Sequence, residues 1–178
     1  MGLDMFLERM PKKKQAFELP ENVENSRNAL AINPVYVESE EIGYWRKANA
    51  IHKWFVDRVQ DGIDDCDYHH EVTREILEEL LGICKRIISN TEIKEEFHAV
   101  GSEVDENGNV IIDMVEEKYM ENVDVAKECL PTQGGFFFGN TDYDEWYLEQ
   151  IKNTIEIITN ALDTTDFENQ VIYYCSSW

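Results

Sequence analysis

Basic side chains are scarce in this chain. Its 178 residues include 37 acidic side chains but only 16 lysines and arginines, which gives a formal net charge of −21. Nucleic-acid backbones and anionic membranes attract positively charged surfaces, so this composition argues against direct binding to either. The acidic surplus agrees with two other properties, which are simple solubility and attraction to a basic partner protein.

Recognisable metal, cofactor and catalytic motifs are missing. The four cysteines form no CxxC pair, and no group of histidines and cysteines has the spacing of a zinc site. The segment "DDCDYHH" (64–70) is rich in metal-ligating residue types, but we interpret it as a solvated loop, because ligands adjacent in sequence rarely converge on one ion. No GxSxG, HExxH, GxGxxG or kinase motif is present. We therefore predict no metal and no cofactor, and a binding protein is favoured over an enzyme.

Long apolar runs and a secretory signal are absent as well. We expect no membrane insertion, and a cytosolic protein whose thiols stay reduced. Proline is rare, and three of the four prolines fall within residues 11–40. This stretch is also rich in asparagine and glutamate, so we predict a loop-like accessory segment there.

The hydrophobic residues that are present, 43% of the chain, suffice for a real core. We predict a single α+β domain over residues 1–178, with three or four helices packed on a small antiparallel sheet that uses both chain termini. A β-hairpin and a short helix would form an insertion over residues 92–128, with the hairpin turn at "ENGN". The other expected elements are a strand in Leu3–Met10, a helix at Tyr44–Val59 that stops near Gly62, a helix capped by Thr73, a helix capped by Thr141 or Asp142, and a terminal strand in "QVIYYCSSW".

The segment "EIGYWRKANAIHKWF" (Glu41–Phe55) is unusually dense in aromatic and basic residues. If Tyr44–Val59 is one helix at about 100° per residue, its apolar side forms a core stripe. A second arc then carries side chains suited to stacking, anion contact and hydrogen bonding. We predict that this arc binds a ligand, and the alternative is an ordinary polar helix face. The core stripe consists of Tyr44, Ala48, Ile51, Phe55 and Val59, and the arc of Trp45, Arg46, Asn49, His52 and Lys53.

The segment "PTQGGFFFGNT" (Pro131–Thr141) is the second unusual stretch. Its three consecutive phenylalanines cannot all point to one side if the backbone is extended. Gln133, Phe136, Phe137 and Phe138 are therefore candidate binding residues, and the alternative is a loop that its aromatic side chains plug into the core.

Several motifs together resemble a known family. "LDMFL", "YWRKANAIHKWFV", "QDGIDDC", "LPTQGGFFFGNTDYDEWY" and the terminal "YYCSSW" are similar to those of a family of small bacteriophage and prophage proteins. Some members carry the label phosphoglycerate kinase, which this chain is too short to support. The resemblance implies an accessory protein in the cytoplasm of a bacterial host, and it supplies no catalytic residues.

Three functions follow as hypotheses. The first is a phage protein that binds, and sequesters, a nucleotide-like host signal or otherwise counters host defence, because stacking and cationic side chains suit a base with a phosphate. The second is an acidic module that inhibits a basic host protein. The third is a hydrolase or transferase acting on a nucleotide, with His52 or an acidic side chain as general base.

Overall fold

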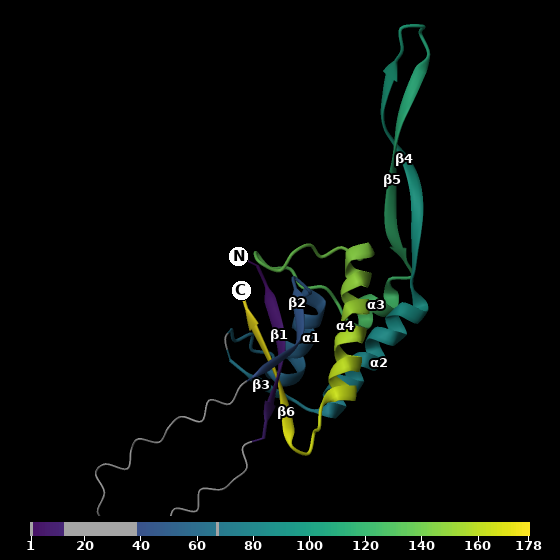
Figure 1. Cartoon of the computed structure of the whole chain (residues 1–178). Helices are drawn as coiled ribbons and strands as arrows, with labels where there is room; N and C mark the ends of the chain where they lie inside the picture. Colours follow the sequence, from purple (N-terminus) through teal and green to yellow (C-terminus); the bar gives the residue numbers. More distant parts are fainter. Residues whose placement is uncertain (1, 13–38, 67) are drawn as a thin grey trace, which may run out of the picture.

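A computed structural model describes residues 2–12, 39–66 and 68–178 of the chain. The predicted α+β class is confirmed, with four helices and two antiparallel sheets in these residues. Most of the accessory segment predicted at 11–40 lies outside the described residues. The elements in chain order are β1 (Asp4–Pro11), β2 (Glu40–Arg46), α1 (Asn49–Val59), β3 (His70–Val72), α2 (Arg74–Asn90), β4 (Glu92–Val104), β5 (Val110–Glu121), α3 (Asp124–Cys129), α4 (Glu145–Thr164) and β6 (Gln170–Ser177) (Figure 1).

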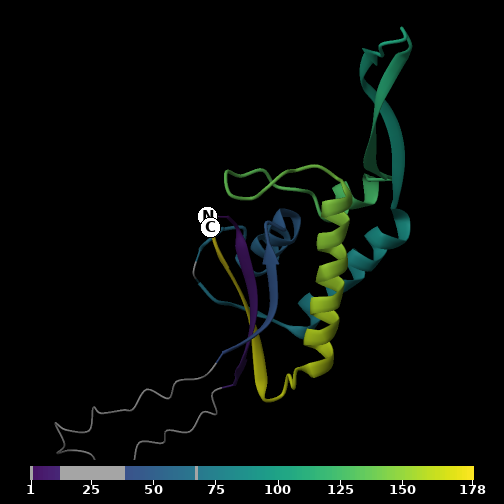
Figure 2. The same cartoon turned by 45° about the horizontal axis from the view of Figure 1, so that its top comes forward.

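The main sheet has its two chain-terminal strands at the centre, in the order β2-β1-β6-β3. Strands β1 and β6 pair antiparallel over their full lengths, from Asp4 opposite Ser177 to Pro11 opposite Gln170. This pairing confirms the predicted use of both termini, and Figure 2 shows the two chain ends side by side. Because these strands lie at the centre, each backbone has hydrogen-bonding partners on both sides.

One face of the sheet packs on the helices and forms the core. Its side chains alternate along each strand, as a half-buried strand requires. Leu7 of β1 and Tyr174 of β6 are fully buried on this inner face, whereas Glu8 and Tyr173 are not. Complete burial of one large aliphatic side chain contributes about 1.5–3 kcal/mol. Helix α4 packs on β2, and α2 packs on α4 (Figure 1).

The helix predicted from Tyr44 begins later than expected. Residues Tyr44–Arg46 belong to β2, which pairs antiparallel with β1 and places Trp45 opposite Met5. Lys47 then adopts a positive φ of 55°, which turns the chain into α1 at Asn49. Residues Tyr44–Arg46 form a strand and not a helical turn because their backbone groups bond to β1. In this conformation Trp45 also reaches the core. Tyr44, predicted in the core stripe, is exposed instead.

Side-chain hydrogen bonds cap the first turns of α2 and α4. Thr73 accepts a hydrogen bond from the Ile76 amide, which confirms the predicted cap of α2. The cap predicted for α4 was wrong by two residues or more, because Asp144 accepts from the Tyr147 amide at 2.9 Å. The predicted stop of α1 is confirmed, with Gly62 at a φ of +76°.

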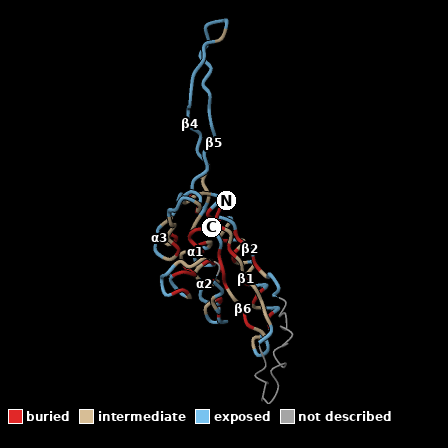
Figure 3. Tube along the Cα trace, turned by 90° about the vertical axis from the view of Figure 1, so that its left-hand side faces the viewer, coloured by how far each residue is buried: buried red, intermediate tan, exposed pale blue. Residues whose placement is uncertain are grey.

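Strands β4 and β5 form the predicted hairpin. The turn motif does not specify their length, and they are long, with 13 and 12 residues. We call Glu92–Glu121 the arm, because it projects far from the rest of the molecule (Figure 1). Only its base joins the core, where Met120 is buried and Ile93 packs beside it. Figure 3 shows the arm exposed along most of its length. Among the described helices, none combines the length and apolarity needed to cross a lipid bilayer.

Candidate functional site

The nine predicted binding residues divide into a buried group and a surface group. Four side chains are buried, and they come from β2, α1 and the segment Pro131–Thr141, which we call the aromatic loop. The other five are partly or fully exposed, and they come from the same three segments. The buried group is Trp45, Asn49, His52 and Phe138, and the surface group is Arg46, Lys53, Gln133, Phe136 and Phe137.

Trp45 is a core residue. Only 1% of its surface is exposed, and its ring lies 6.1 Å from that of Phe55. Its indole Nε1 donates a hydrogen bond of 2.9 Å to Thr154 Oγ1 on α4, which satisfies the one polar atom of the ring. The indole therefore joins the sheet to α4, and it leaves no open ring face on which a ligand base could stack.

Asn49 holds the aromatic loop against α1. Its Nδ2 donates to the carbonyl oxygens of Phe138 and Asn140, at 3.0 and 2.8 Å. Its Oδ1 accepts from the backbone amide of Gln133 at 3.0 Å. One amide side chain thus satisfies three backbone groups at both ends of the loop, which an apolar residue of similar size cannot do. Helix α1 and the loop therefore do meet, and structural hydrogen bonds join them.

His52 lies fully buried between Tyr174 and Asp64. Its Nδ1 is 2.7 Å from the Tyr174 hydroxyl, and its Nε2 is 3.0 Å from Asp64 Oδ2. A carboxylate only accepts, so Nε2 donates to Asp64, and in the tautomer with its proton on Nε2 the ring accepts the Tyr174 proton at Nδ1. Burial raises the pKa of Tyr174 well above its ordinary value, so the phenol keeps its proton. The imidazole is fully buried, so neither ring nitrogen is open to solvent or to a bound substrate in this arrangement.

Residues 64–66 and 68–69 of the "DDCDYHH" segment lie outside helices and strands, whereas His70 begins β3, and specific contacts hold Asp64 and Asp65. Asp65 Oδ1 accepts from Gln60 Nε2 at 3.1 Å and lies 2.7 Å from His70 Nε2. Asp64 also lies 3.4 Å from the indole nitrogen of Trp178. The contacts tie the loop to α1 and to the chain end.

The space between α1, the aromatic loop and α4 is small. A depression beside Asn49, bordered by Thr132, Trp146 and Gln150, has a cavity volume of about 20 Å³. A cavity of that size holds about one water molecule. A nucleotide does not fit there, so the convergence of helix and loop leaves no enclosed pocket for one.

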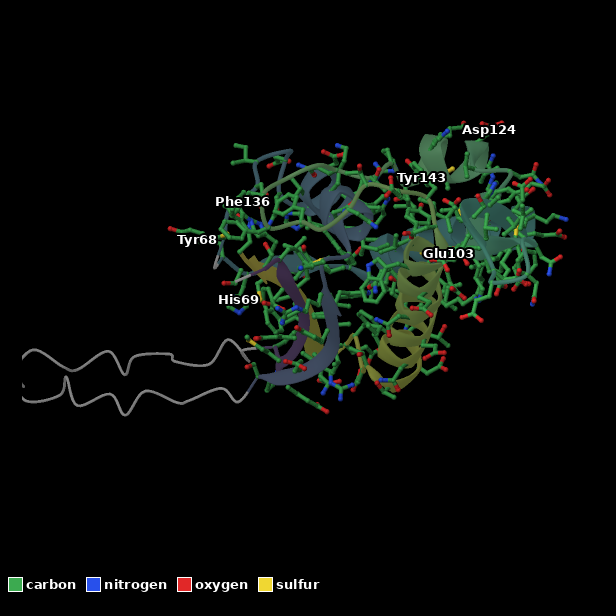
Figure 4. The ribbon with its side chains drawn as sticks, turned by 90° about the horizontal axis from the view of Figure 1, so that it is seen from above. Tyr68, His69, Glu103, Asp124, Phe136 and Tyr143 are labelled. Atoms are coloured by element: carbon green, nitrogen blue, oxygen red, sulfur yellow. The ribbon has the colours of Figure 1, made fainter. Side chains whose placement is uncertain are left out.

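The surface group faces solvent from separate elements. The Arg46 guanidinium lies 3.7 Å from Asp4, and Lys53 Nζ bonds Asp57 at 2.7 Å. Phe136 is 95% exposed, at the tip of the aromatic loop (Figure 4), and its ring lies 4.9 Å from that of Phe137. Phe138 turns inward, and its ring meets His52 edge-on at 5.2 Å. The three phenylalanines thus do not all point to one side, as the sequence predicted.

A surface that sequence patterns did not single out lies on the arm. Exposed apolar side chains occupy both strands there, including Phe97, Val100, Val104, Val110, Ile111, Ile112, Met114 and Val115. A run such as "VIIDMV" has the apolar content of a buried strand, so the sequence alone does not reveal that it is exposed. The sequence feature that could have indicated an exposed arm is its charge, because ten acidic and only two basic residues lie between Glu92 and Glu121.

No protein-family model, curated protein or solved structure matches the chain. The resemblance to phage proteins therefore stays a prediction. The features that bear on function are the exposed arm and the surface residues Arg46 and Phe136.

Proposed function

We propose that the protein is an acidic protein-binding module that docks on a basic partner through its arm. The observation that carries this proposal is the exposure of large apolar side chains on both strands of the arm. Monomeric proteins rarely expose contiguous apolar surface of this kind unless it binds something. Phe97, Val100, Ile112 and Met114 are each more than half exposed, far from the core.

The charge of the arm specifies the chemistry of its partner. Acidic residues outnumber basic ones by ten to two between Glu92 and Glu121. Lys94 and Lys118 already lie near acids of the arm or of α4, at distances of 3.4–3.9 Å. The remaining carboxylates would repel an acidic partner and attract a basic one. A basic protein with an apolar groove complements both properties.

The backbone of the arm supports the same proposal. Within the described residues, β4 and β5 form a two-stranded sheet that pairs with no third strand. Each strand thus has one edge whose amide and carbonyl groups are open to another chain, as in β-strand addition. A two-stranded hairpin is only marginally stable in water, and a partner strand or groove would stabilise it.

The resemblance to phage proteins suggests the biological setting. In this proposal the protein acts in the cytoplasm of a bacterial host, and it blocks a basic host protein by occupying its surface. Countering host defence is one effect of such a block. The mechanism needs no catalytic group, because occupancy alone excludes the natural ligand of the partner.

A second candidate function, binding of a nucleotide-like molecule, has one supporting observation. A methyl group added to Gly2 would lie 3.2 Å from Lys47 Cε, 3.7 Å from an Arg46 guanidinium nitrogen and 3.9 Å from the carbonyl oxygen of Phe137. Two cationic side chains therefore border the loop that exposes Phe136. A surface site for a base and a phosphate would use Phe136 for stacking and Arg46 for the anion.

Affinity capture with matched variants tests the first candidate. Wild-type protein should retain a basic protein from a bacterial lysate, and the triple variant Phe97→Thr, Val100→Thr and Ile112→Thr should lose it. Threonine keeps strand propensity while it removes apolar surface. The control is Ile63→Thr, which changes an equally exposed apolar residue outside the arm. Equal capture by wild type and triple variant would refute the role of the arm.

The captured protein must then pass a second test with purified components. Calorimetry should give an affinity that falls as sodium chloride rises, because attraction between exposed charges is screened. An acidic partner, or an affinity independent of salt, would contradict the proposal.

Calorimetry also tests the second candidate function, with nucleotides and cyclic nucleotides as the titrated ligands. Binding that is absent, or unchanged by Arg46→Ala and Phe136→Ala, would exclude it.

A further inference from the structure

We propose that Glu8, His69 and Cys175 form a binding site for a divalent transition-metal cation such as Zn²⁺. Within the described residues, one donor atom from each of these side chains lies within 4.8 Å of the other two. The three residues come from separate segments of the chain, so no motif spacing in the sequence predicts the cluster. Their chemistry includes one sulfur, one nitrogen and one oxygen donor.

The main sheet places these three residues together. In the β1–β6 pair, Glu8 lies opposite Tyr173 and Phe6 opposite Cys175, so Glu8 and Cys175 share the outer face. His69 directly precedes β3, where His70 pairs with Tyr174, so His69 comes beside Cys175. Figure 4 shows His69 near Tyr68, on the side of the molecule away from Glu103 of the arm. Two of the donors thus sit on central strands, which is the rigid support that a metal site needs.

The distances are close to those of a coordination sphere. His69 Nε2 lies 3.3 Å from Glu8 Oε2. Ligand atoms at about 2.0–2.3 Å from a tetrahedral ion lie roughly 3.3–3.8 Å from one another. Since no separation in the cluster exceeds 4.8 Å, the largest must shrink by no more than roughly 1.5 Å. Rotation of the partly exposed Glu8 and His69 side chains supplies that movement, while the buried Cys175 keeps its place on β6.

The donor set selects the class of metal. Zn²⁺ and related ions accept thiolate, imidazole and carboxylate ligands, whereas Mg²⁺ and Ca²⁺ prefer oxygen alone. On binding, the Cys175 thiol forms a sulfur–metal bond and releases its proton to solvent. Glu41 lines the same cleft and adds a second carboxylate. A divalent cation would offset this local accumulation of negative charge.

The cleft leaves room beside the ion. It has a volume of about 230 Å³, and its walls also include Phe6, Ser176 and Ser177. Three protein ligands leave the fourth tetrahedral position open to this space, where water or a small anion can bind. The site lies on the sheet, so its failure in a test would leave the proposed role of the arm untouched.

Titration of the purified, reduced chain with Co²⁺ tests this proposal. We expect one Co²⁺ per chain, a thiolate-to-cobalt charge-transfer band, displacement by Zn²⁺ and no displacement by Mg²⁺. Cys175→Ser should abolish the band. Glu8→Gln and His69→Gln should each weaken Co²⁺ binding at least about 100-fold, because loss of a ligand exceeds the 10- to 100-fold effect typical of outer-shell partners.

Matched controls separate this site from other thiols and histidines. Cys129→Ser removes a half-buried thiol on α3, and His98→Gln removes an arm histidine that lies 3.6 Å from both Glu96 and Glu117. Both variants should bind Co²⁺ as the wild type does. If Cys175→Ser fails to fold, the Glu8 and His69 variants still decide the question, because they change partly exposed side chains. The proposal fails if wild type shows no thiolate band, or if Glu8→Gln and His69→Gln both retain full affinity.

Discussion

At the scale of single residues, burial decides which polar side chains hold the fold and which remain available. His52, Asn49 and Trp45 carry the functional groups of a binding site, and all three are occupied inside the protein. His52 depends on Tyr174 as a hydrogen-bond donor, since its other ring nitrogen faces Asp64. The pair therefore works as one structural unit that joins α1 to β6.

Replacement of Tyr174 by phenylalanine tests that unit. Tyr174→Phe leaves His52 Nδ1 buried without its donor, so we expect the free energy of unfolding to fall by about 1–3 kcal/mol. Urea denaturation followed by tryptophan fluorescence measures this change. Tyr173→Phe is the matched control on the outer face of the same strand, and we expect a change within about 0.5 kcal/mol. Equal effects of the two substitutions would show that the bond to His52 adds no stability.

At the scale of elements, the sequence predicted most of the regular structure, but it missed β2 and β3 and misplaced the starts of α1 and α4. The 3.6-residue period of α2 and the turn of the arm depend on nearby residues, so they are visible in a short window. The segment Gly43–Arg46 also alternates inward and outward, but its partner β1 lies about forty residues away in sequence. A helical period through Ala48, Ile51 and Phe55 masked that alternation. Trp45 and Arg46 therefore joined the predicted arc only because the helix was extended backward, whereas Asn49, His52 and Lys53 do lie on α1.

The turn of the arm has a pH dependence that belongs to this scale. Asp105 accepts hydrogen bonds from the Asn109 side chain and from the amides of Asn107 and Asn109. The Asn109 side chain is the main cause that lowers the pKa of Asp105. A lowered folded-state pKa means that the carboxylate stabilises the turn above the unfolded-state pKa. This contribution is lost as pH falls through the folded-state value.

We therefore expect the turn to stay ordered from neutral pH down to about pH 4, and to loosen below it. Hydrogen exchange and chemical shifts of the Asn107 and Asn109 amides measure this change. Asp105→Asn is the control, because asparagine forms similar turns and does not titrate. The interpretation is wrong if the wild type and the Asp105→Asn variant respond alike to acid.

At the scale of the whole molecule, contacts between distant segments and with partners decide which features the sequence could predict. The predicted pairing of the two termini accounts for the centre of the sheet, and local patterns account for most helices. The exposed surface of the arm could not be predicted in that way, because an apolar run has the same sequence whether a core or a partner covers it. The metal-ligand cluster escaped prediction for a related reason, since only the folded sheet brings Glu8 near Cys175.

The net charge of −21 predicts opposite effects of salt on stability and on binding. Sodium chloride screens the repulsion among acids of the free protein, so its melting temperature should rise by about 2–4 °C for each kcal/mol of repulsion removed. The same screening weakens attraction to a basic partner, since the Debye length falls from about 10 Å at 0.1 M to about 3 Å at 1 M. Calorimetry and thermal unfolding in one series of buffers measure both slopes.

Two charge-matched variants locate the two salt effects. One variant, the arm variant, changes three exposed acids of the arm to glutamine. The other, the body variant, changes three exposed acids outside the arm to glutamine. Both should flatten the dependence of melting temperature on salt, because each removes three negative charges. Only the arm variant should flatten the dependence of partner affinity, because steering depends on charges near the contact. Equal effects on affinity would place the docking surface elsewhere and leave the arm without this role. The arm variant carries Glu96→Gln, Glu103→Gln and Glu116→Gln, and the body variant carries Glu149→Gln, Glu156→Gln and Glu168→Gln.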